Sequence, residues 1–263
     1  MSEEGAPEPE EIYERTRKEG QRRLSRPPLE VASTAVAAGV DVVFGIAALG
    51  FTEAAVEPHF GKELAHLAGA VAFGVAFVFI IVGRSELFTE NFLVPLAGLE
   101  GGDRRSWFKL GELWTLSPLF NILGGTALVL VLSTHGVLPH GSGHAITRAG
   151  NVFDDYTFTS AFMSAIAAGA LITLMTWMIE GQHSMGVRVA VAWIVGAVLA
   201  LGQFNHVIVA TLDEVFGIRL GSSIGWVDLF QNLLTAGAGN VIGGLLFVTL
   251  TRFTQARSGG GSS

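Results

Sequence analysis

Six long apolar stretches, two of them interrupted by polar residues, constrain the fold of this chain more than any other feature of its sequence. A helix needs about 20 mostly apolar residues to cross a bilayer. Four stretches of about that length run without a break, at residues 31–51, 110–133, 157–179 and 227–250. The first contains one charge, Asp41, which needs a polar partner inside the protein. The pattern predicts an all-α membrane protein, and the low charged fraction of 15% agrees with that.

The other two stretches stop at clusters of polar residues and then resume. Residues 67–82 end at Gly83-Arg-Ser-Glu86, and the apolar pattern resumes at 92–99. Residues 187–201 end at Gly202-Gln-Phe-Asn-His206 and resume at 207–216. Non-helical backbone at membrane depth is tolerated only where protein buries it or where it lines a water-filled cavity. We therefore predict six spans, with the second and fifth broken beside a solute path.

An internal repeat supports this arrangement. Trp107 is followed fourteen residues later by Asn121-Ile-Leu-Gly-Gly, and Trp226 is followed fourteen residues later by Asn240-Val-Ile-Gly-Gly. Each half carries its broken span just before this unit. Because three spans make an odd number, the two halves must cross the membrane in opposite orientations, and such inverted repeats place the solute site near the midplane. The repeated glycines also permit close helix packing.

The distribution of lysine and arginine predicts the orientation. With both ends in the cytoplasm, twelve of these residues lie in cytoplasmic segments and three lie in outer loops, at Lys62, Arg148 and Arg219. Arg84 lies within the second span. Since cytoplasmic loops carry the excess of positive charge, we expect a multi-pass protein of the cell (inner) membrane with both termini cytoplasmic.

The chain divides into three predicted segments. Residues 1–28 are polar and cytoplasmic, and within them 8–24 read equally well as a charged surface helix or as disorder. Residues 29–253 form the transmembrane domain. Residues 254–263 form a tail that ends in SGGGSS, which reads as a linker. The chain has no cysteine and no basic stripe, so we expect no disulfide, no thiolate metal site and no nucleic-acid partner.

The first break contains four side chains that would be costly against lipid. These are Arg84, Glu86, Glu90 and Asn91. One interpretation is that Glu86 or Glu90 pairs with Arg84 and holds the loop together. In that case Thr89 and Phe88 become the better candidates for the pore.

The second break contains one histidine, His206, in the apolar interior of the spans. A buried histidine is often a packing residue. Its position at a helix break, opposite another break, favours a role in the pore. An imidazole titrates near neutral pH, so it can offer a hydrogen bond or a proton to a solute.

These residues resemble the motifs of the formate/nitrite transporter family. Gly83 to Thr89 (GRSELFT) resembles the second-helix loop of that family, and Phe204 to Ala210 (FNHVIVA) resembles its fifth-helix loop. The two Asn-x-x-Gly-Gly units resemble the ends of its third and sixth spans. The four motifs occur in the family's order, and the resemblance runs from about residue 29 to residue 253.

The resemblance implies an aquaporin-like protomer with an inverted 3+3 repeat, assembled as a homopentamer in the lipid bilayer with one pore in each protomer. The family passes small monovalent anions such as formate, nitrite, acetate, lactate or hydrosulfide. The resemblance places Thr89 and His206 opposite each other at the pore centre, where His206 donates a hydrogen bond or a proton. It assigns apolar constrictions and polar path residues to Phe73, Phe77, Phe88, Leu199, Glu86, Asn91 and Asn205.

The chain departs from the family pattern at three places. The acid that usually precedes the central histidine is Asn205 here. The amide common on the fourth span is replaced near Gly169, and no lysine stands near Phe153, where formate channels carry one at the outer mouth. These departures place the chain in a divergent, YfdC-like branch, for which the resemblance predicts the fold and leaves the substrate open.

Three functions remain in view. The first is a channel or proton-coupled transporter for a weak-acid anion. The second keeps the fold and passes a cation or a small neutral solute, favoured by acids at Glu86, Glu90, Asp213 and Glu214. The third is an intramembrane enzyme, but a zinc site needs three protein ligands in reach and no His-Glu-x-x-His spacing occurs. We expect no enzyme, no metal and no cofactor. The chain also lacks the Asn-Pro-Ala motif of aquaglyceroporins.

Overall fold

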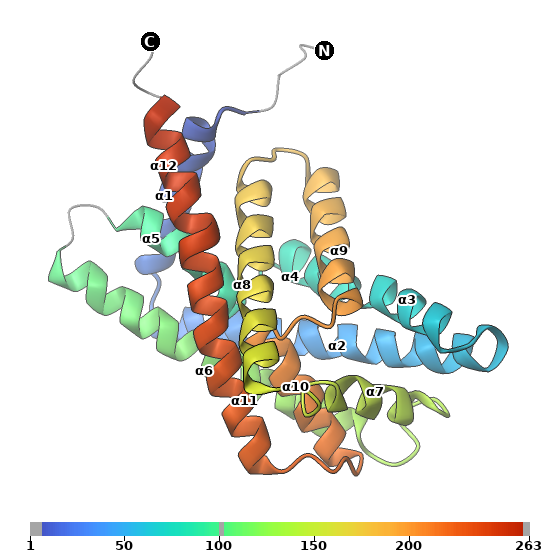
Figure 1. The fold of residues 1–263 in the computed structure, drawn as a ribbon. Helices are drawn as coiled ribbons and strands as arrows, with labels where there is room; N and C mark the ends of the chain where they lie inside the picture. Colours follow the sequence, from blue (N-terminus) through green and yellow to red (C-terminus); the bar gives the residue numbers. More distant parts are fainter. Residues whose placement is uncertain (1–6, 100–102, 260–263) are drawn as a thin grey trace.

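A computed structural model describes residues 7–99 and 103–259, and all regular secondary structure within those residues is helical. Figure 1 shows a helical fold in which the N- and C-terminal helices, α1 (Pro9–Leu24) and α12 (Leu250–Gly259), lie together at one end. We call this end the terminal face and the other end the opposite face.

The first half of the membrane domain contains the first three predicted spans. Its elements are α2 (Pro28–Phe60), α3 (Lys62–Phe73), α4 (Val75–Gly83), the 3-10 helix η1 (Phe88–Phe92), α5 (Val94–Gly98) and α6 (Arg104–Leu132). The backbone is not helical between α4 and η1, where the sequence predicted the first break.

The second half repeats this order. Its elements are α7 (Ser142–Asn151), α8 (Phe158–Glu180), α9 (Met185–Leu201), α10 (Val207–Arg219), α11 (Trp226–Ile242), the π-helix η2 (Gly243–Thr249) and α12. The last three run on as one helix (Figure 1). The short helix α7 was not predicted, because the connection that contains it has no long apolar stretch.

The predicted spans are confirmed. Five helices of the described chain are long and apolar enough to cross a membrane, and the shorter apolar helix α9 continues as α10 after the second break. In each half the first span packs along the third, α2 against α6 and α8 against α11.

Glycines fix how closely these paired spans approach. A Cβ atom on Gly39 of α2 would lie 1.9 Å from the Asn121 carbonyl oxygen, and one on Gly169 of α8 would lie 2.1 Å from the Asn240 carbonyl oxygen. A side chain at either position would have to displace backbone. The fourth span therefore has no room for an amide at Gly169, and the two halves use the same contact.

The helix α1 settles the choice between helix and disorder for residues 9–24. It packs on α5 so closely that a Cβ on Gly20 would lie 2.1 Å from the Val94 carbonyl oxygen. It also contacts α12, where the rings of Tyr13 and Phe253 meet edge to face at 4.9 Å. The predicted boundaries at residues 28 and 254 thus separate segments that pack together. Residues 1–6 and 260–263, which include most of the SGGGSS linker, lie outside the described residues.

Candidate functional site

The backbone of the first break is held by one asparagine of the third span. The Asn121 Nδ2 donates to the carbonyl oxygens of Ala35 at 2.9 Å and Glu86 at 3.0 Å, and its Oδ1 accepts from the Phe88 N–H at 2.9 Å. Asn121 is fully buried. Its amide therefore supplies the partners that the interrupted helix cannot provide for itself.

The backbone of the second break is held in the same way from the sixth span. The Asn240 Nδ2 donates to the carbonyl oxygens of Ala165 at 2.8 Å and Asn205 at 3.0 Å, and its Oδ1 accepts from the Val207 N–H at 2.9 Å. The repeated asparagines are visible in the sequence, but their role as anchors of the two breaks follows only from the structure.

The two breaks meet at Thr89 and His206. The Thr89 Oγ1 lies 2.7 Å from the His206 Nε2, and both residues are fully buried. His206 also caps α10, since its Nδ1 accepts from the Val209 N–H at 3.3 Å. A backbone N–H can only donate, so Nδ1 carries no hydrogen and the neutral ring donates from Nε2 to Thr89. The Thr89 hydroxyl has no other partner in the described chain, which leaves its hydrogen for a solute.

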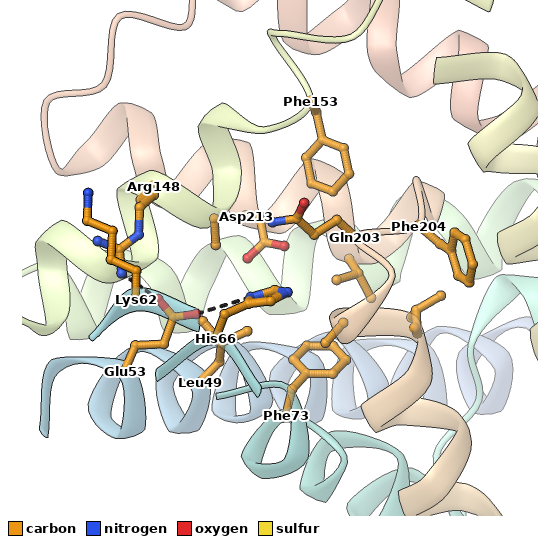
Figure 2. Close-up of a pocket in the computed structure, with 14 residues that line it drawn as sticks. Leu49, Glu53, Lys62, His66, Phe73, Arg148, Phe153, Gln203, Phe204 and Asp213 are labelled. Carbon is orange, nitrogen blue, oxygen red and sulfur yellow. Dashed lines mark hydrogen bonds and ion pairs between the residues drawn. The ribbon is translucent and has the colours of Figure 1, made fainter. Parts of the chain in front are cut away.

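A pocket of about 200 Å³ lies at the opposite face (Figure 2), and its lining includes Gln203 and Phe204 of the second break. Apolar side chains at its base include Phe73 and Leu199, and Val209 of α10 also lines it. Its charged side chains are Glu53, Lys62, His66, Arg148 and Asp213. The predicted path residues Phe73 and Leu199 thus both line this pocket.

A second pocket, of about 370 Å³, lies at the terminal face and is lined mostly by charged side chains. The start of α9 lines this pocket at Met185 and Arg188, and the end of the same helix lines the first pocket at Leu199. The two pockets therefore open at opposite ends of the bundle. Glu90, next to Thr89, lines the terminal pocket, so the buried pair lies between the two pockets.

The acids of the first break are paired with Arg23 of α1 and with Arg26 in the turn after α1, and not with Arg84. The Arg26 Nη1 donates to the Glu86 Oε2, and Arg23 lies 3.6 Å from a carboxylate oxygen of both Glu86 and Glu90. Arg84 ends α4 in the left-handed conformation, with φ of 55°, and forms no ion pair among the described residues. The predicted pairing with Arg84 is wrong, because the cations come from α1 and the turn after it, about 60 residues earlier in the chain.

The carboxylates around Arg23 determine the direction in which its pKa shifts. Burial alone would lower the pKa of the Arg23 guanidinium, but the carboxylates of Glu86, Glu90 and Glu19 raise that pKa above its usual value. Arg23 also donates to the Asn91 Oδ1 at 3.0 Å. The helix α1 thus binds two of the predicted path residues, Glu86 and Asn91, through one buried cation.

Two further predicted path residues, Phe88 and Asn205, pack beside the breaks. The ring of Phe88 packs edge to face on those of Phe92 and Trp114, at 4.9 and 6.4 Å. Asn205 donates to the Asn232 Oδ1 at 2.7 Å and to the Ala161 carbonyl oxygen at 3.3 Å. Both side chains therefore stabilise the walls of the breaks.

The structure also shows the surroundings of Phe77, Asp41 and Phe153, three further positions from the sequence analysis. The ring of Phe77 packs behind Phe73, with ring centroids 6.2 Å apart. The partner that Asp41 requires is Ser85 in the first break, whose Oγ donates to the Asp41 Oδ2 at 2.6 Å. No lysine is near Phe153 in the sequence, yet Lys62 lines the same pocket as Phe153. The contact of Asp41 with Ser85 and the shared pocket of Lys62 and Phe153 could not be predicted, because the residues of each pair are far apart in the sequence.

The comparisons with known proteins point to one family. The family described as "Formate/nitrite transporter" matches residues 10–254. The "Inner membrane protein YfdC" of Escherichia coli (strain K12) is 27% identical over 251 residues, covering 94% of this chain and 78% of that protein. The "Probable formate transporter" of Methanothermobacter thermautotrophicus is 27% identical over 232 residues, covering 80% and 83%.

Two solved structures share the fold. A "Pentameric formate channel with formate bound" matches with a TM-score of 0.74 and 22% identity, over 86% of this chain and 96% of that one. An "FNT family ion channel" matches with a TM-score of 0.77 and 20% identity, over 92% and 98%. At these identities the likeness is one of fold.

Proposed function

The chain belongs to the formate/nitrite transporter family, and on this premise we propose that each protomer conducts a small weak-acid anion of the formate or nitrite type past Thr89 and His206. The observation that carries the proposal is the buried pair itself. Its hydrogen-bond donors point in one direction, from His206 to Thr89 and from Thr89 to a solute. The buried pair between the two pockets therefore offers a donor, which suits an anion.

The physical reason for this donor is the cost of moving a charge through an apolar passage. An unpaired ion in a low-dielectric environment is very unfavourable. One hydrogen bond to a charged group contributes about 1.5–3 kcal/mol. A cation would gain nothing from a hydroxyl hydrogen, so the centre favours the anion over the alternative of a cation.

The proposal also covers the oligomeric state, the cellular location and the type of activity. The proposed oligomer is a homopentamer, supported by the pentameric channel of the same fold. The proposed location is the inner membrane with both termini cytoplasmic, supported by the twelve-to-three distribution of lysine and arginine. The terminal face would then be cytoplasmic. A transport role without catalysis is supported by the family, and no group of acids and histidines in the described residues could hold a metal ion.

The proposal is tested by flux into liposomes that contain the purified protein. The panel consists of formate, nitrite, acetate, chloride, ammonium and glycerol at two pH values. We expect passage of the weak-acid anions above the rate of protein-free liposomes. Passage of ammonium or glycerol without passage of any weak-acid anion would contradict the proposal and favour the cation or neutral-solute alternative.

A further inference from the structure

Asp213 is a buried acid without a partner in the pocket at the opposite face. It is 8% exposed, and Figure 2 shows its carboxylate pointing into the pocket. In residues 7–99 and 103–259 no hydrogen bond or ion pair reaches this carboxylate. The next residue, Glu214, differs, since its Oε1 accepts from the Asn232 Nδ2 at 2.7 Å and it lines a separate pocket.

Asp213 lies about two helical turns from the central histidine, His206. Asp213 follows His206 by seven residues on α10. Seven residues make about two helical turns, so the two side chains share a face of α10 and stand about 10 Å apart along its axis. Val209 lies between them and lines the same pocket. A solute from the opposite face therefore passes Asp213 before it reaches His206.

The neighbouring charges leave Asp213 uncompensated. On α7, Arg148 is already bound to Glu53 and Glu57 of α2, with both distances at 2.7 Å. On α3, the His66 Nδ1 lies 3.6 Å from Glu53.

The remaining contacts of α10 supply little charge. Lys62 of α3 lines the pocket, but its side chain is exposed to solvent. The helix α6 meets α10 at the uncharged residues Gly125 and Leu212. The helix α11 meets α10 at Asn232, which binds Glu214.

We propose that Asp213 selects the state in which the pocket admits a small monovalent anion: its ionised carboxylate repels the anion, and its protonated carboxyl donates a hydrogen bond to it. The proton comes from the solution at the opposite face and stays on Asp213 while the anion passes. The rate of anion uptake from that face should therefore rise as the pH there falls. This inference rests on the conduction of weak-acid anions proposed above.

The test compares Asp213→Asn with the unchanged protein. Asparagine removes the charge and keeps a hydrogen-bond donor of nearly the same shape. Formate uptake is measured in vesicles of one orientation, with the inner pH fixed, the outer pH at 5.5 or 7.5, and the flux of protein-free vesicles subtracted. The unchanged protein should lose roughly tenfold in uptake at the higher pH, because like charges a few ångströms apart repel strongly in a partly buried site. Asp213→Asn should stay within about twofold over the same range.

The matched control is Glu214→Gln, which makes the same change in charge one residue away and keeps the acceptor for Asn232. It should retain the pH response of the unchanged protein, and Asp213→Glu should retain it as well. A pH response that survives in a correctly assembled Asp213→Asn protein would overturn the inference. An equal loss in Glu214→Gln would also overturn it. Uptake of no weak-acid anion at either pH would instead overturn the proposed function and this inference with it.

Discussion

In both breaks an asparagine of a neighbouring span holds the backbone through hydrogen bonds, but the side chains around the two breaks differ in charge. Asn121 and Asn240 each make three hydrogen bonds to backbone groups, with lengths between 2.8 and 3.0 Å. Around the first break lie paired acids and arginines, whereas around the second break lie the amides of Asn205 and Asn232. The repeat therefore determines the backbone of both breaks, and residues outside the repeat determine their charge.

This difference assigns a structural role to α1. Glu86 and Glu90 are almost fully buried and would be uncompensated charges without Arg23 and Arg26. The second break finds its partners within its own half of the membrane domain. The acids of the first break thus depend on Arg23 of α1 and on Arg26 in the turn after it, whereas the amides of the second break find their partners within their own half.

The strongest test of the two asparagine anchors is removal of each one, Asn121→Leu in one variant and Asn240→Leu in another. Each change leaves two buried backbone groups of a break unpaired, the Glu86 carbonyl and Phe88 N–H in one variant and the Asn205 carbonyl and Val207 N–H in the other. At about 1–3 kcal/mol for each group, the cost should be about 4 kcal/mol. Thermal unfolding in detergent should show two large and similar losses of stability. A large loss in one variant and none in the other would break the equivalence of the two breaks.

The next largest effect should come from Arg26→Met, which leaves Glu86 as a buried charge. Breaking a buried ion pair from one side costs about 3–5 kcal/mol. Arg22→Met is the matched control, since the Arg22 side chain is 57% exposed, and an exposed pair contributes about 1 kcal/mol or less. The double change Arg26→Met with Glu86→Gln should recover part of the loss. Equal effects of Arg26→Met and Arg22→Met on the melting temperature would show that the buried contact of Arg26 with Glu86 does not stabilise the first break.

A smaller effect is expected at the second break from Asn232→Leu. The change removes neutral hydrogen bonds to Asn205 and one to Glu214, at a cost of about 2 kcal/mol. Gln231→Leu, on the exposed side of the same helix, serves as the control. We expect Asn232→Leu to lower the melting temperature less than Arg26→Met does. The opposite order would show that the second break depends on its polar neighbours more than the first, which would contradict the difference described above.

The smallest effect is a pH dependence of the docking of α1. Burial alone would raise the pKa of Glu19, but the hydrogen bond from Arg22 and the charges of Arg22 and Arg23 lower it below its usual value. Because the pKa of Glu19 is lower in the folded than in the unfolded protein, its ionised carboxylate stabilises the fold. This stabilisation is fully present above the usual pKa of about 4.3, and it is lost as the pH falls through the pKa of Glu19 in the folded protein.

Hydrogen exchange of the α1 amides measures this effect. Exchange, corrected for its intrinsic pH dependence, should quicken as the pH falls below about 4. Glu19→Gln should show the faster exchange already at neutral pH. Identical exchange in the two proteins at both pH values would show that Glu19 does not hold α1.

The sequence predicted the spans and the position of both breaks, because apolar length and its interruption are local signals. The contact of Thr89 with His206 came from resemblance to a family and not from periodicity. The pairing of Arg23 with Asn91 joins residues 68 positions apart, and no local pattern encodes such a pairing. The short helix α7 was missed because its amphipathic sequence is too short to stand out as a span.

The most direct measurement of the central claim is formate flux through His206→Leu in liposomes. Leucine removes the donor to Thr89 and the cap of α10. Without His206 the Thr89 hydroxyl is no longer held with its hydrogen toward the solute. Loss of that hydrogen bond to the solute, at about 1.5–3 kcal/mol, should slow flux by roughly one to two orders of magnitude, and loss of the cap should cost about 1 kcal/mol of stability. His206→Asn keeps a donor and an acceptor for the cap, so part of the flux should survive. Unchanged formate flux in a correctly assembled His206→Leu protein would show that the histidine only packs, and it would contradict conduction past the donor of the Thr89 and His206 pair.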